Sequence, residues 1–222
     1  MSKWLQRYGY FLLGLAINAF GIAFITKGAL GTSPISSIPY VFSLFFEQVS
    51  FGTFTFLLNM IFIALQVVIL RRKFHPVQLL QIVANLLFSA FIDVSMYALT
   101  WLSPDTWVMR GLSLLLGCVV LALGISIEVA PNVIVVPGEG IVRAIAQASK
   151  KEFGKIKVYF DITLIAIGAT CSFLFFHSLQ GMGIGTLISA IAVGKFVSLF
   201  NRHFPLIRHI KTLDKPIKPH ST

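Results

Sequence analysis

The chain has few charged residues. Asp, Glu, Lys and Arg make up 12% of its 222 positions, whereas an ordinary soluble domain has about 25%. Hydrophobic residues make up 56%, and the mean hydropathy is +0.86. Because so little polar surface is available to cover a soluble fold, this composition excludes a soluble domain. It indicates an integral membrane protein whose first partner is the lipid bilayer.

Cysteine and short catalytic motifs are also scarce. The only cysteines, Cys118 and Cys171, fall within apolar runs, where a thiol usually behaves as a small core residue. They indicate neither a disulfide framework nor a metal site. The sequence has no HExxH, no phosphate-binding loop and no arrangement of a nucleophile with its base. We therefore expect no catalytic residues, no cofactor and no enzyme activity.

Acidic residues are fewer than basic ones, 8 against 18, which gives a net charge of +10. The basic residues follow the membrane instead of forming a nucleic-acid patch, because fifteen of the eighteen fall on one side of the expected spans. The positive-inside rule therefore predicts a multi-pass protein of the bacterial cell membrane with both termini in the cytoplasm. The fifteen are Lys3, Arg7, Arg71, Arg72, Lys73, Arg143, Lys150, Lys151, Lys155, Lys157, Arg202, Arg208, Lys211, Lys215 and Lys218.

Six apolar runs are near the length of about 20 residues that crosses a bilayer as a helix. We predict an all-α fold with these six as transmembrane helices. They are Tyr8–Thr26, Phe51–Leu70, Val77–Leu102, Trp107–Val129, Val158–Phe176 and Gly183–Phe200.

The second half of the chain repeats the first. Phe51-Gly52 recurs as Phe153-Gly154, and a weaker match near the ends places Asn85 opposite Ser189. Since each copy has three spans, the second copy enters the membrane from the opposite side, which predicts an inverted 3+3 repeat. The expected units are 1–105, 106–204 and a basic cytoplasmic tail at 205–222. Four further pairs are 103 positions apart: Arg7 and Arg110, Gly14 and Gly117, Gly21 and Gly124, Pro34 and Pro137.

Two segments that follow the first span of each copy are too apolar for plain loops. They are KGALGTSPISSIPYVFSLFFEQ at 27–48 and APNVIVVPGEGIVRAIAQASKK at 130–151. Thr32 or Ser33 can cap a helix that begins at Pro34, and Pro137 can open the second helix. If both helices are broken or re-entrant, their N-termini meet near the membrane centre. The alternative is two amphipathic helices that lie flat at the interfaces.

Ionisable side chains inside spans are rare and are candidate functional groups. We assign ion coupling to Asp93, Glu128, Asp161 and Lys195, and expect Asp93 to pair with Lys195 across the repeat axis. The carboxylates of Asp161 and of Glu139 belong to the second copy alone, which favours proton or sodium coupling. The residues expected to bind substrate are Thr32, Ser33, Ser36, Asn59, Pro137, Gly138, Glu139 and Gly140.

These elements resemble those of the YczE/YitT-type bacterial integral membrane proteins, which typically have LG-x-x-P followed by an acidic residue in each half. Leu30, Gly31 and Pro34 match the first element, and Pro137 with Glu139 and Gly140 match the second. Two departures are Ser36, where the family has an acid, and Ile134 and Val135, where it has Leu-Gly. The resemblance spans nearly the whole chain and implies a fold more firmly than an activity.

The functional expectation is a secondary transporter of a small solute, coupled to protons or sodium, with a site at the midplane between the repeats. Two alternatives remain: a substrate-binding membrane subunit of a vitamin-uptake type of transporter, and a channel. Helix N-termini favour an anion, whereas the excess of carboxylates favours a cation or a proton. The identity of the solute, the direction of transport and any homo-oligomeric state stay open.

Overall fold

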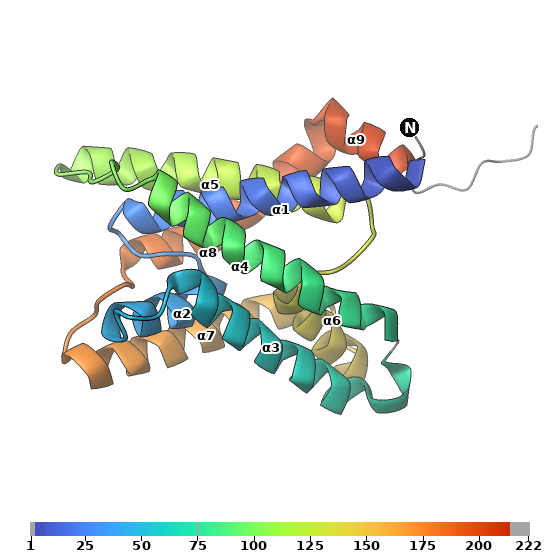
Figure 1. The fold of residues 1–222 in the computed structure, drawn as a ribbon, viewed down its shortest axis with the longest axis horizontal. Coiled ribbons are helices and arrows are strands. Elements are labelled where there is room, and N and C mark those ends of the chain that lie inside the picture. The colour runs from blue at the N-terminus through green and yellow to red at the C-terminus, as the bar shows by residue number, and fades with distance from the viewer. Residues whose placement is uncertain (1–2, 75, 214–222) are drawn as a thin grey trace, which may run out of the picture.

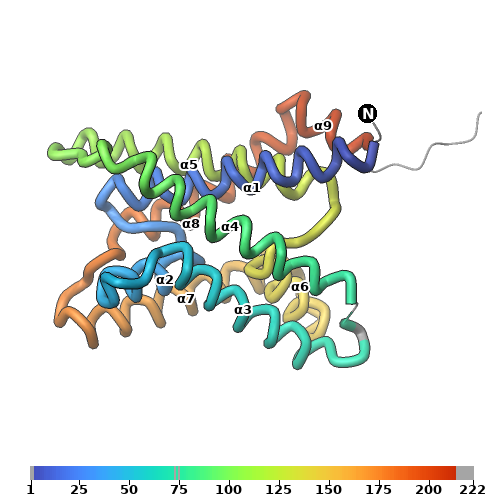
Figure 2. Tube along the Cα trace, viewed as in Figure 1, coloured from blue at the N-terminus to red at the C-terminus, as the bar shows by residue number. Residues whose placement is uncertain are grey.

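The computed structural model describes residues 3–74 and 76–213, and this part of the chain is helical (Figures 1 and 2). Six of its helical segments are long and apolar enough to cross a membrane, and they match the six predicted spans. The long helices are α1 (Lys3–Lys27), α3 (Phe51–Leu70), α4 (Leu80–Ala98), α5 (Trp107–Val129), α7 (Phe153–Phe176) and α8 (Ile184–His203). The short ones are α2 (Pro34–Phe45), η1 (Arg71–Lys73), η2 (Pro76–Leu79), α6 (Pro137–Ser149) and α9 (Pro205–Thr212).

Most contacts between helices come in two versions, one for each copy of the sequence repeat. Helix α1 packs on α4 and α5 packs on α8; α2 packs on α7 and α6 packs on α3. The α1–α4 contact is the repeat counterpart of the α5–α8 contact, and the α2–α7 contact is that of the α6–α3 contact. One pair breaks the pattern, because α3 packs along α4 whereas α7 and α8 have no comparable contact. Figure 1 shows α4 crossing between the α1–α5 pair and α3.

The closest packing joins α1 and α5, which run antiparallel along one edge of the bundle (Figure 1). Their glycines let the two backbones approach: a Cβ on Gly14 or on Gly124 would lie 2.6 Å from a Cα of the other helix. Each contact maps onto another contact in the set when its positions are shifted by the repeat interval of 103. The four contacts are Gly14 with Glu128, Gly21 with Leu121, Gly117 with Ile25, and Gly124 with Asn18.

Both short helices begin where the sequence predicts, at a proline in the first turn. Ser33 is the N-cap residue of α2, and Val136 is that of α6. Helix α2 packs against α3, α7 and α8, and α6 packs against α3 and α7, so neither lies flat on an outer surface. Figure 1 shows both helices starting near the middle of the bundle and running outward to opposite ends.

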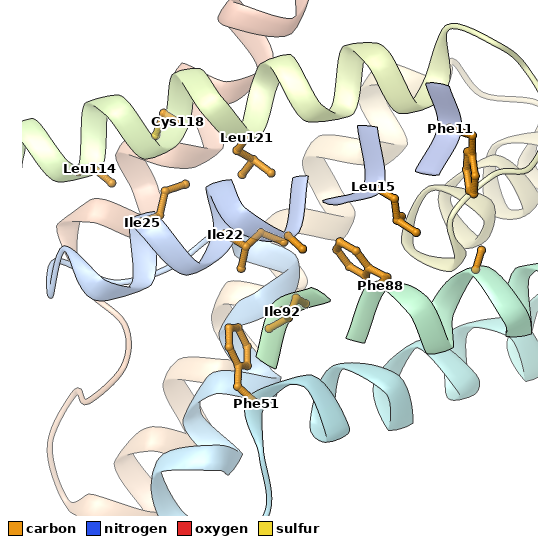
Figure 3. Close-up of a cluster of buried hydrophobic side chains, with 12 residues drawn as sticks. Phe11, Leu15, Ile22, Ile25, Phe51, Phe88, Ile92, Leu114, Cys118 and Leu121 are labelled. Carbon is orange, nitrogen blue, oxygen red and sulfur yellow. The ribbon is translucent and has the colours of Figure 1, made fainter. Parts of the chain in front are cut away.

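An apolar core fills the space between α1, α4, α5 and the start of α3 (Figure 3). Ile22 and Ile25 of α1 lie against Leu121 of α5, and Phe51 and Ile92 close the lower side. These side chains are almost fully buried. The core therefore holds α1, α4 and α5 together.

Several helix boundaries differ from the sequence prediction; α1, for example, begins at Lys3 instead of Tyr8. Helix α7 begins at Phe153 instead of Val158, so Lys155 and Lys157 lie in its first turns and not in a loop. Within the expected basic tail, residues 205–212 form the short amphipathic helix α9. Ile207 and Ile210 of α9 are buried against the end of α5. The rest of the expected tail, 214–222, lies outside the described residues.

Candidate functional site

A cavity of about 390 Å³ lies at the centre of the bundle. Its walls come from both halves of the chain: α1, α2, α3 and α4 on one side, α5, α6, α7 and α8 on the other. The lining is mainly apolar, with Phe88, Leu121 and Ile125 among its residues. Six of the predicted site residues line it: Ser33, Ser36, Asn59, Gly138, Glu139 and Asp161.

The N-termini of α2 and α6 meet at this cavity, as the sequence predicts. Gly138 in the first turn of α6 directly contacts the side chain of Ile35 in the first turn of α2. The Ser33 hydroxyl donates to the Ser36 hydroxyl at 2.8 Å, so it does not cap the backbone of its own helix. The positive end of the α2 helix dipole therefore faces the cavity.

Glu139 is the acidic residue at the start of α6, where the helix dipole favours a negative charge. Its side chain lines the cavity and makes no hydrogen bond or ion pair with any residue in the described ranges. Burial raises the pKa of this carboxyl group above its ordinary value, while nearby Arg143 and Lys157 act in the opposite direction. Glu139 is thus a partly buried carboxyl group without a committed partner.

A second carboxyl group lies directly behind the cavity wall. Glu128, in the last turn of α5, is 2% exposed and accepts a hydrogen bond from Asn18 Nδ2 at 2.7 Å. It is close enough to Glu139 for the two charges to repel each other. Asn18 itself lines the cavity, and its Oδ1 is buried without a partner among the described residues. The wall therefore presents two acceptors, the Asn18 amide oxygen and the Glu139 carboxylate, that no described residue satisfies.

Asp161 faces the cavity but is paired. Lys157 Nζ donates to Asp161 Oδ1 at 2.6 Å, one helical turn apart on α7. Both side chains line the cavity. This ion pair neutralises Asp161, so Glu139 and Glu128 are the carboxyl groups there without a paired cation among the described residues.

Asn59 also lines the cavity and has a structural role at the same time. Its Nδ2 donates to Asn85 Oδ1 at 2.8 Å, and Asn85 Nδ2 donates in turn to the carbonyl of Phe56 at 3.1 Å. These bonds join α3 to α4. The amide pair fixes one wall of the cavity against the helix behind it.

Pro137 and Gly140 are not in the lining, although the sequence places them in the site. They pack against Gln66 of α3, whose Nε2 donates to the carbonyl of Pro137 at 3.3 Å. Gln66 also exchanges hydrogen bonds of 3.2 Å with Gln81 of α4. This buried amide pair positions the start of α6.

Asp93 and Lys195 do not pair, contrary to expectation. Asp93 Oδ1 accepts from the backbone N–H of Gly52 at 2.7 Å, and its Oδ2 accepts from the Ser50 hydroxyl at 2.6 Å. Asp93 therefore binds the N-terminus of α3, away from the cavity. Lys195 is exposed on α8 and makes no ion pair within the part of the chain that the structure describes.

The cavity continues toward the end of the bundle where α1 begins and α9 lies, which we call the terminal face. A second hollow of about 450 Å³ shares Ile125, Glu139, Phe153 and Val197 with the cavity and extends to Asn201 near the end of α8. Arg143 also lines it. The site is thus reached from the terminal face, between α7 and α8.

The opposite face is closed by hydrogen bonds. The segment between α1 and α2 lies on the start of α8, where the Gly185 N–H donates to the Leu30 carbonyl at 2.8 Å. The Thr32 N–H donates to Thr186 Oγ1 at 3.2 Å, and Ser189 Oγ donates to the Thr32 carbonyl at 3.2 Å. Thr32 is therefore a closing residue of the opposite face and not a residue of the cavity lining.

Repeat counterparts differ sharply between the two faces. At the opposite face, Phe51 is 5% exposed, and a Cβ on Gly52 would lie 2.6 Å from the Asp93 carboxylate. At the terminal face, Phe153 is 41% exposed, and a Cβ on Gly154 would have no atom within 4 Å. The start of α3 is therefore packed against α4, whereas the start of α7 is separated from α8.

Sequence reasoning left Asn18 and Lys157 out of the site. Asn18 falls opposite Leu121 of the second copy, and asparagine in a span is more often a helix-packing residue. Lys157 was assigned to a basic loop because the start of α7 was placed five residues too late. Two signals were available in the sequence. Asn18 lies between Gly14 and Gly21, and Lys157 lies four positions before Asp161, the spacing of an ion pair on a helix.

Comparison with known proteins gives one match. Residues 5–202 match DUF6198, a family of unknown function. The chain belongs to this family. No curated protein and no solved structure matches it. The family therefore carries no assigned activity to this chain, and membership in it does not bear on the YczE/YitT resemblance.

Proposed function

We propose that this DUF6198 protein is a secondary transporter of a small solute that works by alternating access between two inverted repeats. The observation that carries the proposal is the one-sided cavity. It lies between the two halves, continues to the terminal face, and is closed at the opposite face by contacts whose repeat counterparts are open. In an inverted-repeat transporter, exchanging the conformations of the two copies gives the other state.

The reciprocal contacts of α1 and α5 support the inverted repeat. The four glycine contacts between α1 and α5 exchange with one another when their positions are shifted by 103. Two antiparallel helices with such contacts are related by a two-fold axis perpendicular to both. Because both helices cross the bilayer, that axis lies in the membrane plane. The basic residues gathered at the terminal face favour a cytoplasmic orientation by the positive-inside rule, so the proposed state faces inward.

Proton coupling is part of the proposal and depends on Glu139 and Glu128. A carboxyl group in an apolar wall without a cation is costly in its charged form, which favours reversible protonation. Two such groups close together can exchange a proton when a solute enters or leaves. Asp161 is a weaker candidate for this step because Lys157 already neutralises it.

Cysteine accessibility tests the proposal without knowledge of the solute. In a background with Cys118→Ala and Cys171→Ala, two single cysteines are labelled with a membrane-impermeant maleimide: Val197→Cys, which lines the hollow at the terminal face, and Ser89→Cys, which packs against the start of α3 on the closed side. We expect Val197→Cys to react from the cytoplasmic side only and Ser89→Cys from the outer side only, at a slower rate.

Other results point to other functions. Simultaneous, rapid reaction at both positions would indicate an open channel. No reaction at Ser89→Cys under any condition would contradict alternating access and favour a substrate-binding subunit that needs a partner.

A further inference from the structure

The charge and shape of the cavity limit the class of solute it can bind. Its surface is mostly apolar, and the polar groups at the α5–α6 end of its wall are hydrogen-bond acceptors: the Glu139 carboxylate and, behind Asn18, that of Glu128. Asn18 is 6% exposed and adds an amide oxygen without a donor. Buried acceptors that lack donors are unfavourable, so a ligand with N–H groups is the chemical complement of this wall.

The basic side chains near this wall do not neutralise its free carboxylate. Lys157 is committed to Asp161 at 2.6 Å. Arg143 is exposed and lines the outer hollow instead of the cavity. Neither forms an ion pair with Glu139, which leaves one carboxylate of the lining open to a cation from outside the chain.

We propose that the cavity binds a small organic cation whose N–H groups reach Glu139 and Asn18 and whose apolar body packs against Phe88, Leu121 and Ile125. This inference rests on the proposed transport function and names its substrate class. The volume of about 390 Å³ suits a solute of one or two rings. A proton on Glu139 competes with the cation for the same oxygens, so binding of one displaces the other.

The test uses three probes of nearly the same shape: benzamidinium, which is a cation, benzamide, which is neutral, and benzoate, which is an anion. Binding to the full chain purified in detergent is measured by isothermal titration calorimetry. We expect benzamidinium to bind at least tenfold more tightly than benzamide, and benzoate not to bind. Glu139→Gln should weaken benzamidinium at least tenfold and leave benzamide unchanged.

The matched control is Glu47→Gln, which makes the same change at an exposed position on the loop after α2. It should leave benzamidinium binding unchanged. Melting temperatures of all three proteins confirm that they are folded. Benzoate binding more tightly than benzamidinium, no binding of any probe to the wild-type protein, or an unaffected Glu139→Gln variant would each overturn the proposal.

The pH profile adds a second readout. Burial raises the pKa of Glu139, whereas nearby Arg143 and Lys157 lower it; Glu128 is the other carboxyl group close to it. As the pH falls, Glu139 therefore takes up a proton at a higher pH than an ordinary carboxyl group does. Benzamidinium stays charged throughout. Its affinity should fall with falling pH in the wild type and stay flat in Glu139→Gln. If cysteine labelling shows alternating access but benzamidinium fails to bind, the transporter proposal stands and only the solute class is wrong.

Discussion

At the scale of single residues, the chain uses acidic side chains for three different purposes. Asp93 binds the start of a helix, Asp161 forms an ion pair with Lys157, and Glu139 stays unpaired beside the cavity. The sequence alone marked all of them as unusual because charges are rare within spans. It did not separate their roles, because each role depends on which helix end or lysine lies opposite in space.

Asp93 is the residue whose removal should disturb the closed face most directly. Asp93→Ala removes both acceptors that hold Gly52 and Ser50, hydrogen bonds of the charged type worth about 1.5–3 kcal/mol each. We expect a lower melting temperature and faster outer-side labelling of Ser89→Cys. The control is Val197→Ala at the repeat counterpart, which makes no such contact and should leave the labelling unchanged. Equal labelling in both variants would show that Asp93 does not hold this face closed.

At the scale of helices, the spacing of glycines fixes the α1–α5 pair. Gly14 and Gly21, with their counterparts Gly117 and Gly124, recur seven residues apart in each copy, a spacing that indicates a close packing face, and the structure brings all four into contact with the other helix. The periodicity was sufficient because glycine is the one residue that allows such an approach. The sequence did not show that the two faces pack on each other, since that depends on the arrangement of the whole bundle.

Gly21→Ala tests this contact. The added methyl group would meet the backbone of Leu121, with its Cα only 2.5 Å away, and such overpacking destabilises by about 1–3 kcal/mol. We expect a clear loss of thermal stability in detergent. Gly9→Ala on the same helix has no atom within 4 Å of the new Cβ and should be neutral or slightly stabilising. Similar melting temperatures for the two variants would contradict the packing account.

The helix ends were predicted less well than the helices. Both prolines correctly marked the starts of α2 and α6, because proline suits the first turn. The start of α7 was placed late because Lys155 and Lys157 resemble loop residues, although one of them reaches Asp161 within the helix. Helix α9 was missed because its sequence is basic and has only two apolar residues that become buried. Ile207 and Ile210 are buried because they pack against the end of α5, a contact that the sequence does not show.

At the scale of the whole molecule, the proposed transport cycle depends on a difference between two equivalent helix pairs, α3–α4 and α7–α8. The sequence repeat predicts that the two halves share one structure, and most helix contacts do come in matching pairs. The packed α3–α4 pair and the separated α7–α8 pair do not match. No sequence pattern could have predicted which pair is closed, because in the proposed alternating-access cycle the same sequence adopts both arrangements.

A cross-link between α7 and α8 tests the central claim most directly. Phe153→Cys and Val197→Cys, in a background without Cys118 and Cys171, are joined by a short bifunctional thiol reagent. The same protein carries Ser89→Cys, which is buried while the cross-link forms, and its labelling from the outer side is measured afterwards. Closing the terminal face should open the opposite one, so we predict at least a tenfold increase in the labelling rate of Ser89→Cys. An unchanged or slower rate, with the cross-link shown to be complete, would contradict alternating access between the two repeats.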